Sequence, residues 1–190
     1  TPIDLLEILI KDEYYNVRRY ATENINLPIK NLEDLSKSED ENIRMGVALN
    51  PNTPLDILIK LSKDKNTWVK QNIIDNPNTP IDILIKLSED SEWEIRSEVA
   101  RNFNTPIETL IKLSKDKDDY VKKNAIKTLE QKDKELNIKI DNNKNTLEDL
   151  FKNKNIDPNS KVGLELLKVY NDTQDKLNKE LEELKTQVVD

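Results

Sequence analysis

Apolar residues in residues 1–131 of the chain recur with a period of 26 residues. Each period contains two leucines three residues apart, and an isoleucine or leucine stands three residues before the first of them. The three columns are Ile3, Ile29, Leu55, Ile81 and Ile107; Leu6, Leu32, Leu58, Leu84 and Leu110; and Leu9, Leu35, Leu61, Leu87 and Leu113. This spacing predicts one buried face on a short helix in every period.

A second helix follows in each period, and its inward face is predicted from aliphatic residues four positions apart. These residues are Val17, Ile43, Val69, Ile95 and Val121, followed by Ala21, Val47, Ile73, Val99 and Ala125. A single helix pair of this size cannot bury its apolar face, whereas stacked pairs can. The period therefore predicts an all-α fold, an α-solenoid of five 26-residue two-helix repeats followed by a C-terminal helical segment.

Start and stop signals support both helices. A proline begins every repeat, at Pro2, Pro28, Pro54, Pro80 and Pro106. The threonine before it, as in Thr53 and Thr79, is predicted to be the N-cap of the first helix, with an acidic residue three positions later completing a capping box. The N-caps of the second helices are predicted at Asp12, Asp64, Asp90 and Asp116, with Ser38 in the second repeat. Asparagines Asn24, Asn50, Asn76 and Asn102 are predicted to end these helices.

The second repeat departs most from the pattern. Leu27 replaces the threonine, Lys30 replaces the acidic residue, and Asn31 and Glu33 stand where later repeats have isoleucine. We expect this repeat to be the least stable of the five, or its polar face to contact another surface. Because the chain opens on Thr1 at a repeat boundary, we also expect it to be a piece of a longer array.

The unit resembles the leucine-rich repeat variant family, whose repeats read approximately N-P-x-T-P-x-x-x-L-x-x-L-A-x-D-x-x-x-x-V-R-x-A-V-A. The matching residues in the fourth repeat are Asn76, Pro77, Thr79, Pro80, Leu84, Leu87, Asp90, Ile95, Arg96, Val99 and Ala100. The D-x-x-x-x-V-R portion is also similar to HEAT repeats. The resemblance covers residues 1–131 and implies an α-solenoid of stacked helices, but no common activity.

The 26-residue period ends after Leu129, which predicts a repeat domain at 1–131 and a separate helical segment at 132–190. Polar residues 142–145 predict a loop or a frayed end, and a short helix is expected from Thr146. A turn at residues 157–160 should precede a long helix over about 160–188, whose apolar residues follow a 4-3 spacing. These residues are Leu167, Tyr170, Leu177, Leu181, Leu184 and Val188. The helix either caps the open end of the solenoid or forms a coiled coil that would allow self-association.

Composition argues against most catalytic chemistry. The chain has no histidine, no cysteine and only two glycines. The usual catalytic triads, thiol nucleophiles, zinc sites and glycine-rich phosphate loops therefore have no residues to form them. We expect no catalytic residue, no metal and no cofactor. No apolar stretch is long enough for a membrane span, and the net charge of −7 disfavours non-specific binding to nucleic acid or an anionic membrane.

Two recurring sets of side chains could carry a function. One basic residue per repeat forms a column: Arg18, Arg44, Lys70, Arg96 and Lys122. The column could be an anion-binding stripe, but we favour a structural ladder in which each base pairs with the aspartate six residues earlier or with that of the neighbouring repeat. The aspartates concerned are Asp12, Asp64, Asp90 and Asp116.

The second set is aromatic and lies near the start of the second helices. Its members are Tyr14, Tyr15, Trp68, Trp93 and Tyr120. Each could pack in the core or staple a helix end. Their identity varies between neighbouring repeats where the core columns do not, so Tyr15, Trp68, Trp93 and Tyr120 are also a candidate partner-binding ridge.

These features predict a non-catalytic protein-interaction scaffold that uses the extended surface of the solenoid. One alternative is a nucleic-acid-binding HEAT-like module, although such binding needs several unpaired lysines or arginines. Another is a structural spacer within a larger assembly protein. The residues identify neither the protein partner nor the cellular compartment.

Overall fold

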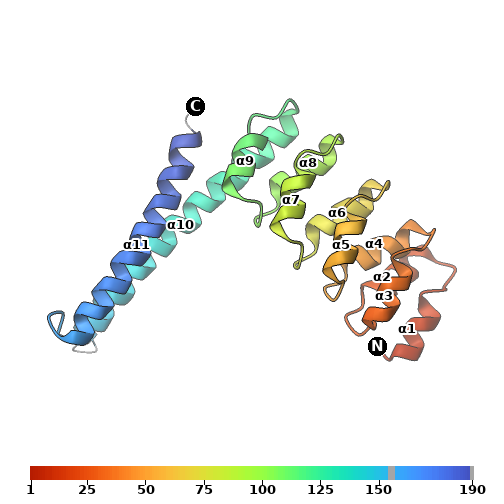
Figure 1. Ribbon diagram of the computed structural model, residues 1–190, viewed down its shortest axis with the longest axis horizontal. Coiled ribbons are helices and arrows are strands. Elements are labelled where there is room, and N and C mark those ends of the chain that lie inside the picture. Colours follow the sequence, from red (N-terminus) through yellow and green to blue (C-terminus); the bar gives the residue numbers. More distant parts are fainter. Residues whose placement is uncertain (154–156, 189–190) are drawn as a thin grey trace. The chain divides into compact units, whose positions relative to one another are not determined.

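The computed structural model describes residues 1–153 and 157–188, and helices make up 71% of the chain. The part that it describes contains helices, turns and loops but no strand, so the prediction of an all-α repeat protein is confirmed. Figure 1 shows the helices α1 to α9 following one another as stacked pairs.

The period of 26 residues corresponds to one helix pair. The first helices of the repeats are α1 (Ile3–Leu9), α3 (Ile29–Leu35), α5 (Leu55–Leu61), α7 (Ile81–Leu87) and α9 (Ile107–Leu113). The second helices are α2 (Tyr15–Glu23), α4 (Glu41–Leu49), α6 (Thr67–Asp75) and α8 (Trp93–Arg101), and α10 (Asp119–Asn153) begins at the fifth such position. The second helices stack directly on one another, α2 on α4, α4 on α6 and α6 on α8.

The core contains one predicted column of the first helices throughout and the predicted columns of the second helices except for Val17, which is half-buried. Leu6, Leu32, Leu58, Leu84 and Leu110 are all buried. So are Val69, Ile73, Ile95 and Val99 of the central second helices. The second leucine column is buried from the third repeat onward and half-buried at Leu9 and Leu35.

One predicted core column is wrong. Ile3, Ile29, Leu55 and Ile81 are exposed, and Ile107 is half-buried. The reason is the orientation of the first helices. Their buried face comprises residues such as Ile57, Leu58 and Leu61, and it turns the first residue of each helix outward.

The predicted N-caps are also corrected. The first helices begin directly after the proline and have no side-chain cap. The Thr53 hydroxyl instead donates to the carbonyl oxygen of Val47, at 2.5 Å, in the last turn of the preceding helix, where carbonyls lack helical partners. Asp64 lies two residues before the N-cap of α6, and its Oδ1 accepts from the N–H of Asn66, which is the cap itself.

The chain divides into two compact units, Thr1–Asn124 and Ala125–Asp190. The helix α10 crosses this division as well as the predicted boundary at residue 131. The predicted loop at residues 142–145 is wrong, because these residues continue α10 without a break. Three of the four residues are asparagines, which are weak helix formers, but no glycine or proline interrupts the segment.

The C-terminal unit contains the rest of α10 and the helix α11 (Lys161–Val188), which lie alongside one another. Gln174 Nε2 donates to the carbonyl oxygen of Ile140 at 3.4 Å, and Leu136 and Leu181 are buried. The turn at 157–160 forms as predicted, and Gly163 is needed there, since a Cβ would lie 2.2 Å from the carbonyl oxygen of Asp157. The side chains of Leu184 and Val188 lie outside the described residues. Among the described residues, no helix has both the length and the apolar character needed to cross a membrane.

Candidate interaction surface

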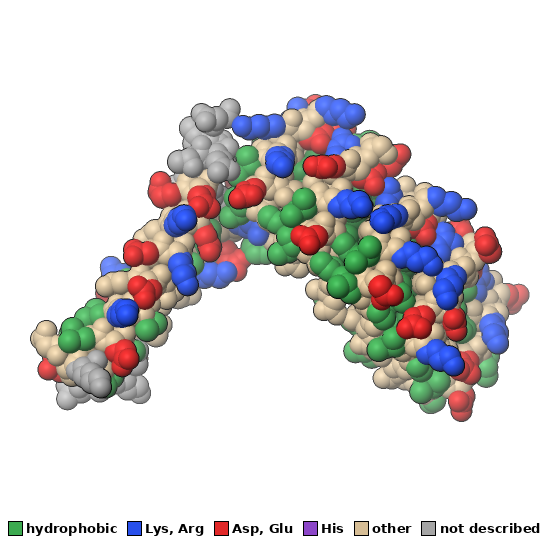
Figure 2. Space-filling model, viewed as in Figure 1, with side chains coloured by type: hydrophobic (Ala, Val, Ile, Leu, Met, Phe, Trp, Pro, Cys, Tyr) green, Lys and Arg blue, Asp and Glu red, His purple; other side chains and the backbone are tan. Residues whose placement is uncertain are grey.

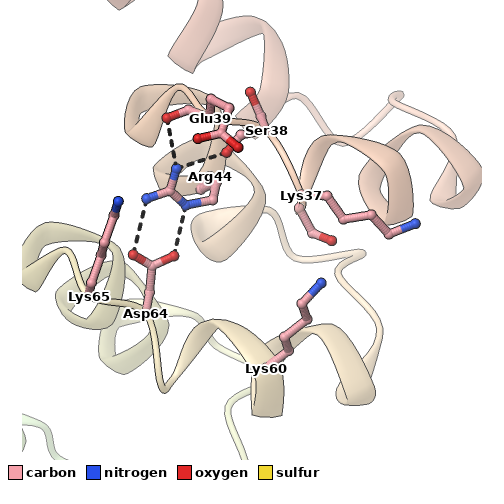
Figure 3. Close-up of a pocket in the computed structure, with 8 residues that line it drawn as sticks. Lys37, Ser38, Glu39, Arg44, Lys60, Asp64 and Lys65 are labelled. Carbon is pink, nitrogen blue, oxygen red and sulfur yellow. Dashed lines mark hydrogen bonds and ion pairs between the residues drawn. The ribbon is translucent and has the colours of Figure 1, made fainter.

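The basic column lies at the junctions between repeats, and Arg44 shows its geometry (Figure 3). Its Nε and Nη2 donate to the two carboxylate oxygens of Asp64 in the next repeat, at 2.8 and 3.1 Å. Its Nη1 donates to the carbonyl oxygens of Ser38 and Glu39, at 2.8 and 3.1 Å. One side chain therefore holds the loop of its own repeat and the loop of the next one, with a bidentate pair that fixes its orientation.

The same arrangement recurs at the other junctions. Arg18 pairs with Asp40 at 2.5 Å, Lys70 with Asp90 at 2.7 Å and Arg96 with Asp116 at 2.7 Å. The second repeat has Ser38 at the usual position of the aspartate, and Asp40 replaces it two residues later.

The two ends of the column differ from its middle. Lys122 pairs with Asp119 of its own helix at 2.7 Å. The carboxylate of Asp12 accepts from the N–H of Tyr14 and has no basic partner among the described residues. The structure therefore brings the first four bases of the column to the aspartate of the following repeat. Arg18 and Arg96 contact the aspartate six residues earlier only through its backbone carbonyl.

These contacts change the protonation of the junction aspartates. Burial alone would raise the pKa of Asp64, but the Arg44 guanidinium and the Asn66 N–H outweigh it, so this pKa lies below its ordinary value. The Arg96 hydrogen bond lowers the pKa of Asp116, and Asp116 in turn raises the pKa of Arg96. The guanidinium donors of Arg44 and Arg96 are used inside the solenoid, which favours the ladder over an anion-binding stripe.

A second ladder, of asparagines, was not predicted. Asn76 Nδ2 donates to the carbonyl oxygens of Ala48 and Asn50 in the preceding repeat, at 2.7 and 2.9 Å. Asn50 makes the equivalent bonds to Thr22 and Asn24, and Asn102 bonds to Ile74. The recurrence of asparagine every 26 residues is the sequence signal for this ladder, but it equally fits a residue that ends a helix.

The aromatic residues all lie at the first turns of second helices or just before them, and all are exposed. Trp68 is 64% exposed and Trp93 is 40% exposed, and Tyr14, Tyr15 and Tyr120 are more than half exposed. The rings of Trp93 and Tyr120, from adjacent repeats, lie 5.5 Å apart at an angle of 31°. The structure therefore brings two of the four candidate ridge residues into contact and places all four at the surface.

Hollows open beside the ladder on the loops that join the two helices of a repeat. One of about 440 Å³ is lined by Ser36, Lys37, Ser38, Glu39, Arg44, Lys60, Asp64 and Lys65 (Figure 3). A hollow of about 290 Å³ follows one repeat later, lined by Ser62, Lys63, Asp64, Lys70, Lys86, Leu87 and Asp90. Both are shallow and open, and acidic and basic side chains line them together.

The described residues contain no group of three or more acidic, histidine or cysteine side chains placed to hold a metal ion. The scan against protein-family models gives no match for this chain. The search of curated proteins also gives no match.

Proposed function

We propose that this solenoid is a non-catalytic scaffold that binds a protein partner along its aromatic edge, formed by Tyr15, Trp68, Trp93 and Tyr120. The observation that carries the proposal is the exposure of both tryptophans on a fold with ample core positions for them. Tryptophan and tyrosine bury a large area at low entropic cost and often dominate binding at interfaces. The proposal agrees with the resemblance to leucine-rich repeat variant and HEAT-like repeats.

The edge is held by a regular framework. Trp68 is the second residue of α6, whose start Asn66 fixes by accepting from the N–H groups of Trp68 and Val69. Tyr120 has the equivalent position in α10, and Asp118 accepts from its N–H at 2.9 Å. Side chains on such rigid helix ends need little ordering when a partner binds.

The test compares capture of binding partners by the immobilised full chain and by two variants. Trp93→Ala should weaken capture at least about tenfold, as is common for a central aromatic anchor, while leaving the urea melt nearly unchanged. Tyr20→Ala removes a ring of α2 that lies outside the edge and is more exposed than Trp93, at 66% against 40%, and it should have no effect on capture. Equal capture by both variants would refute the aromatic edge.

The two alternatives predict other outcomes. A nucleic-acid-binding module would retard nucleic acid in a gel mobility-shift assay, and salt would strongly weaken that binding. A structural spacer would capture no partner at all. The pairing of Arg44 and Arg96 inside the ladder counts against the first alternative. Self-association through the helix at 160–188 is a separate proposal.

A further inference from the structure

The outward faces of the central first helices carry exposed aliphatic side chains. Leu55 and Ile59 on α5 are 54% and 44% exposed, and Ile81 and Ile85 on α7 are 54% and 40% exposed. Figure 2 shows hydrophobic side chains gathered over this part of the solenoid, with acidic and basic side chains beside them. Contiguous exposed apolar surface on a folded protein marks an interaction site more often than isolated exposed residues do.

Each of these helices also presents an acid and a lysine beside its aliphatic pair. We define the first-helix patch as Leu55, Asp56, Ile59 and Lys60 of α5, Ile81, Asp82, Ile85 and Lys86 of α7, and Ile107, Glu108, Ile111 and Lys112 of α9. The helix α9 contributes mainly its charges, because Ile107 is half-buried and Ile111 is buried. The acids and lysines of the patch are exposed. They form an acidic row and a basic row along the stack, one helical turn apart.

Attraction within one helix is the simplest explanation for an acid four residues before a lysine. The structure does not use it here. Among the described residues, no ion pair within 4.0 Å joins Asp56 to Lys60, Asp82 to Lys86 or Glu108 to Lys112, although a pair of this order forms elsewhere, between Glu135 and Lys139. The two rows are therefore available to an external partner.

The second repeat reverses the two charges. Lys30 stands in the acidic row and Asp34 in the basic row, and Glu33 replaces the second aliphatic residue of the patch on α3, while Ile29 stays exposed. The carboxylate of Asp34 forms a surface pair with Lys37 at 3.8 Å. The reversal keeps one acid and one base on the helix, so a partner must tolerate both orders.

A second copy of the chain satisfies these constraints. A twofold axis that runs along the stack, between the two rows, turns a copy over so that each repeat faces the same repeat of its partner. Asp56 then faces the partner's Lys60, and the aliphatic pairs meet each other. The reversed repeat fits the same arrangement, because Lys30 faces the partner's Asp34. A twofold axis across the stack would instead oppose like charges, which is destabilising.

We propose that the first-helix patch is the interface of a homodimer with this twofold axis. An isologous interface requires a surface that complements itself, and all four helices from α3 to α9 meet that requirement in their charges. The proposal is independent of the aromatic edge, because the edge lies on the second helices.

The test measures the mass of the full chain by sedimentation velocity over a range of concentrations. The wild type should dimerise, and more salt should weaken the dimer. Asp56→Lys with Asp82→Lys makes the rows of α5 and α7 entirely basic, so that four facing pairs become repulsive. Its dissociation constant should rise at least about tenfold. Lys60→Asp with Lys86→Asp should do the same with entirely acidic rows.

Two rescue measurements separate the proposal from a folding defect. An equimolar mixture of the basic and acidic variants should form a heterodimer, since each complements the other. The fourfold variant Asp56→Lys, Lys60→Asp, Asp82→Lys and Lys86→Asp has the charge order of the second repeat and should dimerise like the wild type. Trp93→Ala should not change the mass, which keeps this test apart from that of the aromatic edge.

Three outcomes would overturn the proposal. A wild type that is monomeric at every concentration shows that the patch is not a homodimer interface and would have to bind a different protein. A dimer of unchanged strength in both charge variants places self-association elsewhere, with α11 the next candidate. A fourfold variant that is folded, by circular dichroism, yet monomeric shows that complementary facing charges do not determine the interface.

Discussion

Single asparagines determine how closely one repeat is joined to the next. The Asn76 side chain accepts from the N–H of Asn78 and donates to the carbonyls of Ala48 and Asn50. Those two carbonyls belong to the C-terminal end of α4, where helical carbonyls lack partners. An aspartate has no N–H to donate, so the amide is required at this buried position.

We expect Asn76→Ala to lower the free energy of unfolding by about 2–3 kcal/mol, because it leaves two buried carbonyls without a donor. Asn78→Ala is the matched control. Its amide also donates across the junction, to Pro51 at 2.6 Å, but Asn78 is exposed and water can replace it. Urea unfolding followed by tryptophan fluorescence measures both, since both tryptophans lie in the unit Thr1–Asn124. Equal losses in the two variants would contradict this account.

At the scale of elements, the ladder joins each second helix to the loop of the following repeat. Arg96 of α8 donates to both carboxylate oxygens of Asp116, at 2.7 and 2.9 Å, and to the carbonyl oxygens of Asp90 and Ser91. The carboxylate of Asp90 is occupied by Lys70 of the preceding repeat. The coupling energy between Arg96 and Asp116, across the junction, should therefore be large, and that between Arg96 and Asp90, within the repeat, should be small.

A double-mutant cycle tests whether Arg96 couples to Asp116 of the next repeat rather than to Asp90 of its own. Replacing Arg96 by Met and Asp116 by Asn should give a coupling energy of at least about 1 kcal/mol, as expected for a buried contact. The cycle of Arg96 with Asp90 should give a value near zero, because Arg96 meets the backbone of that residue. Arg101 and Glu98 form an exposed pair at 3.0 Å and provide the surface reference, at about 0.3 kcal/mol. A larger coupling to Asp90 than to Asp116 would refute the assignment.

The elements could be predicted from the sequence because the period fixes them together. The leucine column of Leu58 and Leu84 and the column of Val69 and Ile95 are buried as expected. What failed were local alternatives that the period does not decide. Thr53 has a cap signal before a helix, yet its hydroxyl serves the helix behind it.

The candidate site was harder to predict than the fold, because it depends on local side-chain orientations that the repeat period does not decide. Sequence spacing placed Arg96 and Asp90 six residues apart, but whether a carboxylate or a carbonyl faces the guanidinium depends on the path of the loop. It also could not show which aliphatic residue of the first helix turns outward, since Leu55 and Leu58 are equally apolar. The exposure of Leu55, and with it the first-helix patch, required the packed structure.

At the scale of the whole solenoid, the junction aspartates make stability depend on pH. The pKa values of Asp40, Asp64 and Asp116 are all lowered in the folded chain. Burial opposes this at all three, most strongly at Asp40 and Asp64, and hydrogen bonds and the nearby arginines outweigh it. In the unfolded chain each carboxyl returns to about 3.9. As the pH falls below about 5, the unfolded chain therefore takes up protons before the folded chain does.

The sign of the effect follows from this order. The contribution of these aspartates is fully present above the unfolded pKa and is lost as the pH falls through the lower, folded values. Urea unfolding of the wild type at one fixed protein concentration should show a stability that declines from about pH 5 downward. Asp116→Asn should be less stable at pH 7 and should decline less steeply, because one of the coupled carboxylates is gone. Asp4→Asn changes an exposed carboxylate outside the junctions and should follow the wild-type slope. An acid slope that is the same in all three proteins would show that the ladder contributes no charge-dependent stability, and the junctions would then rest on the asparagines and the buried leucines alone.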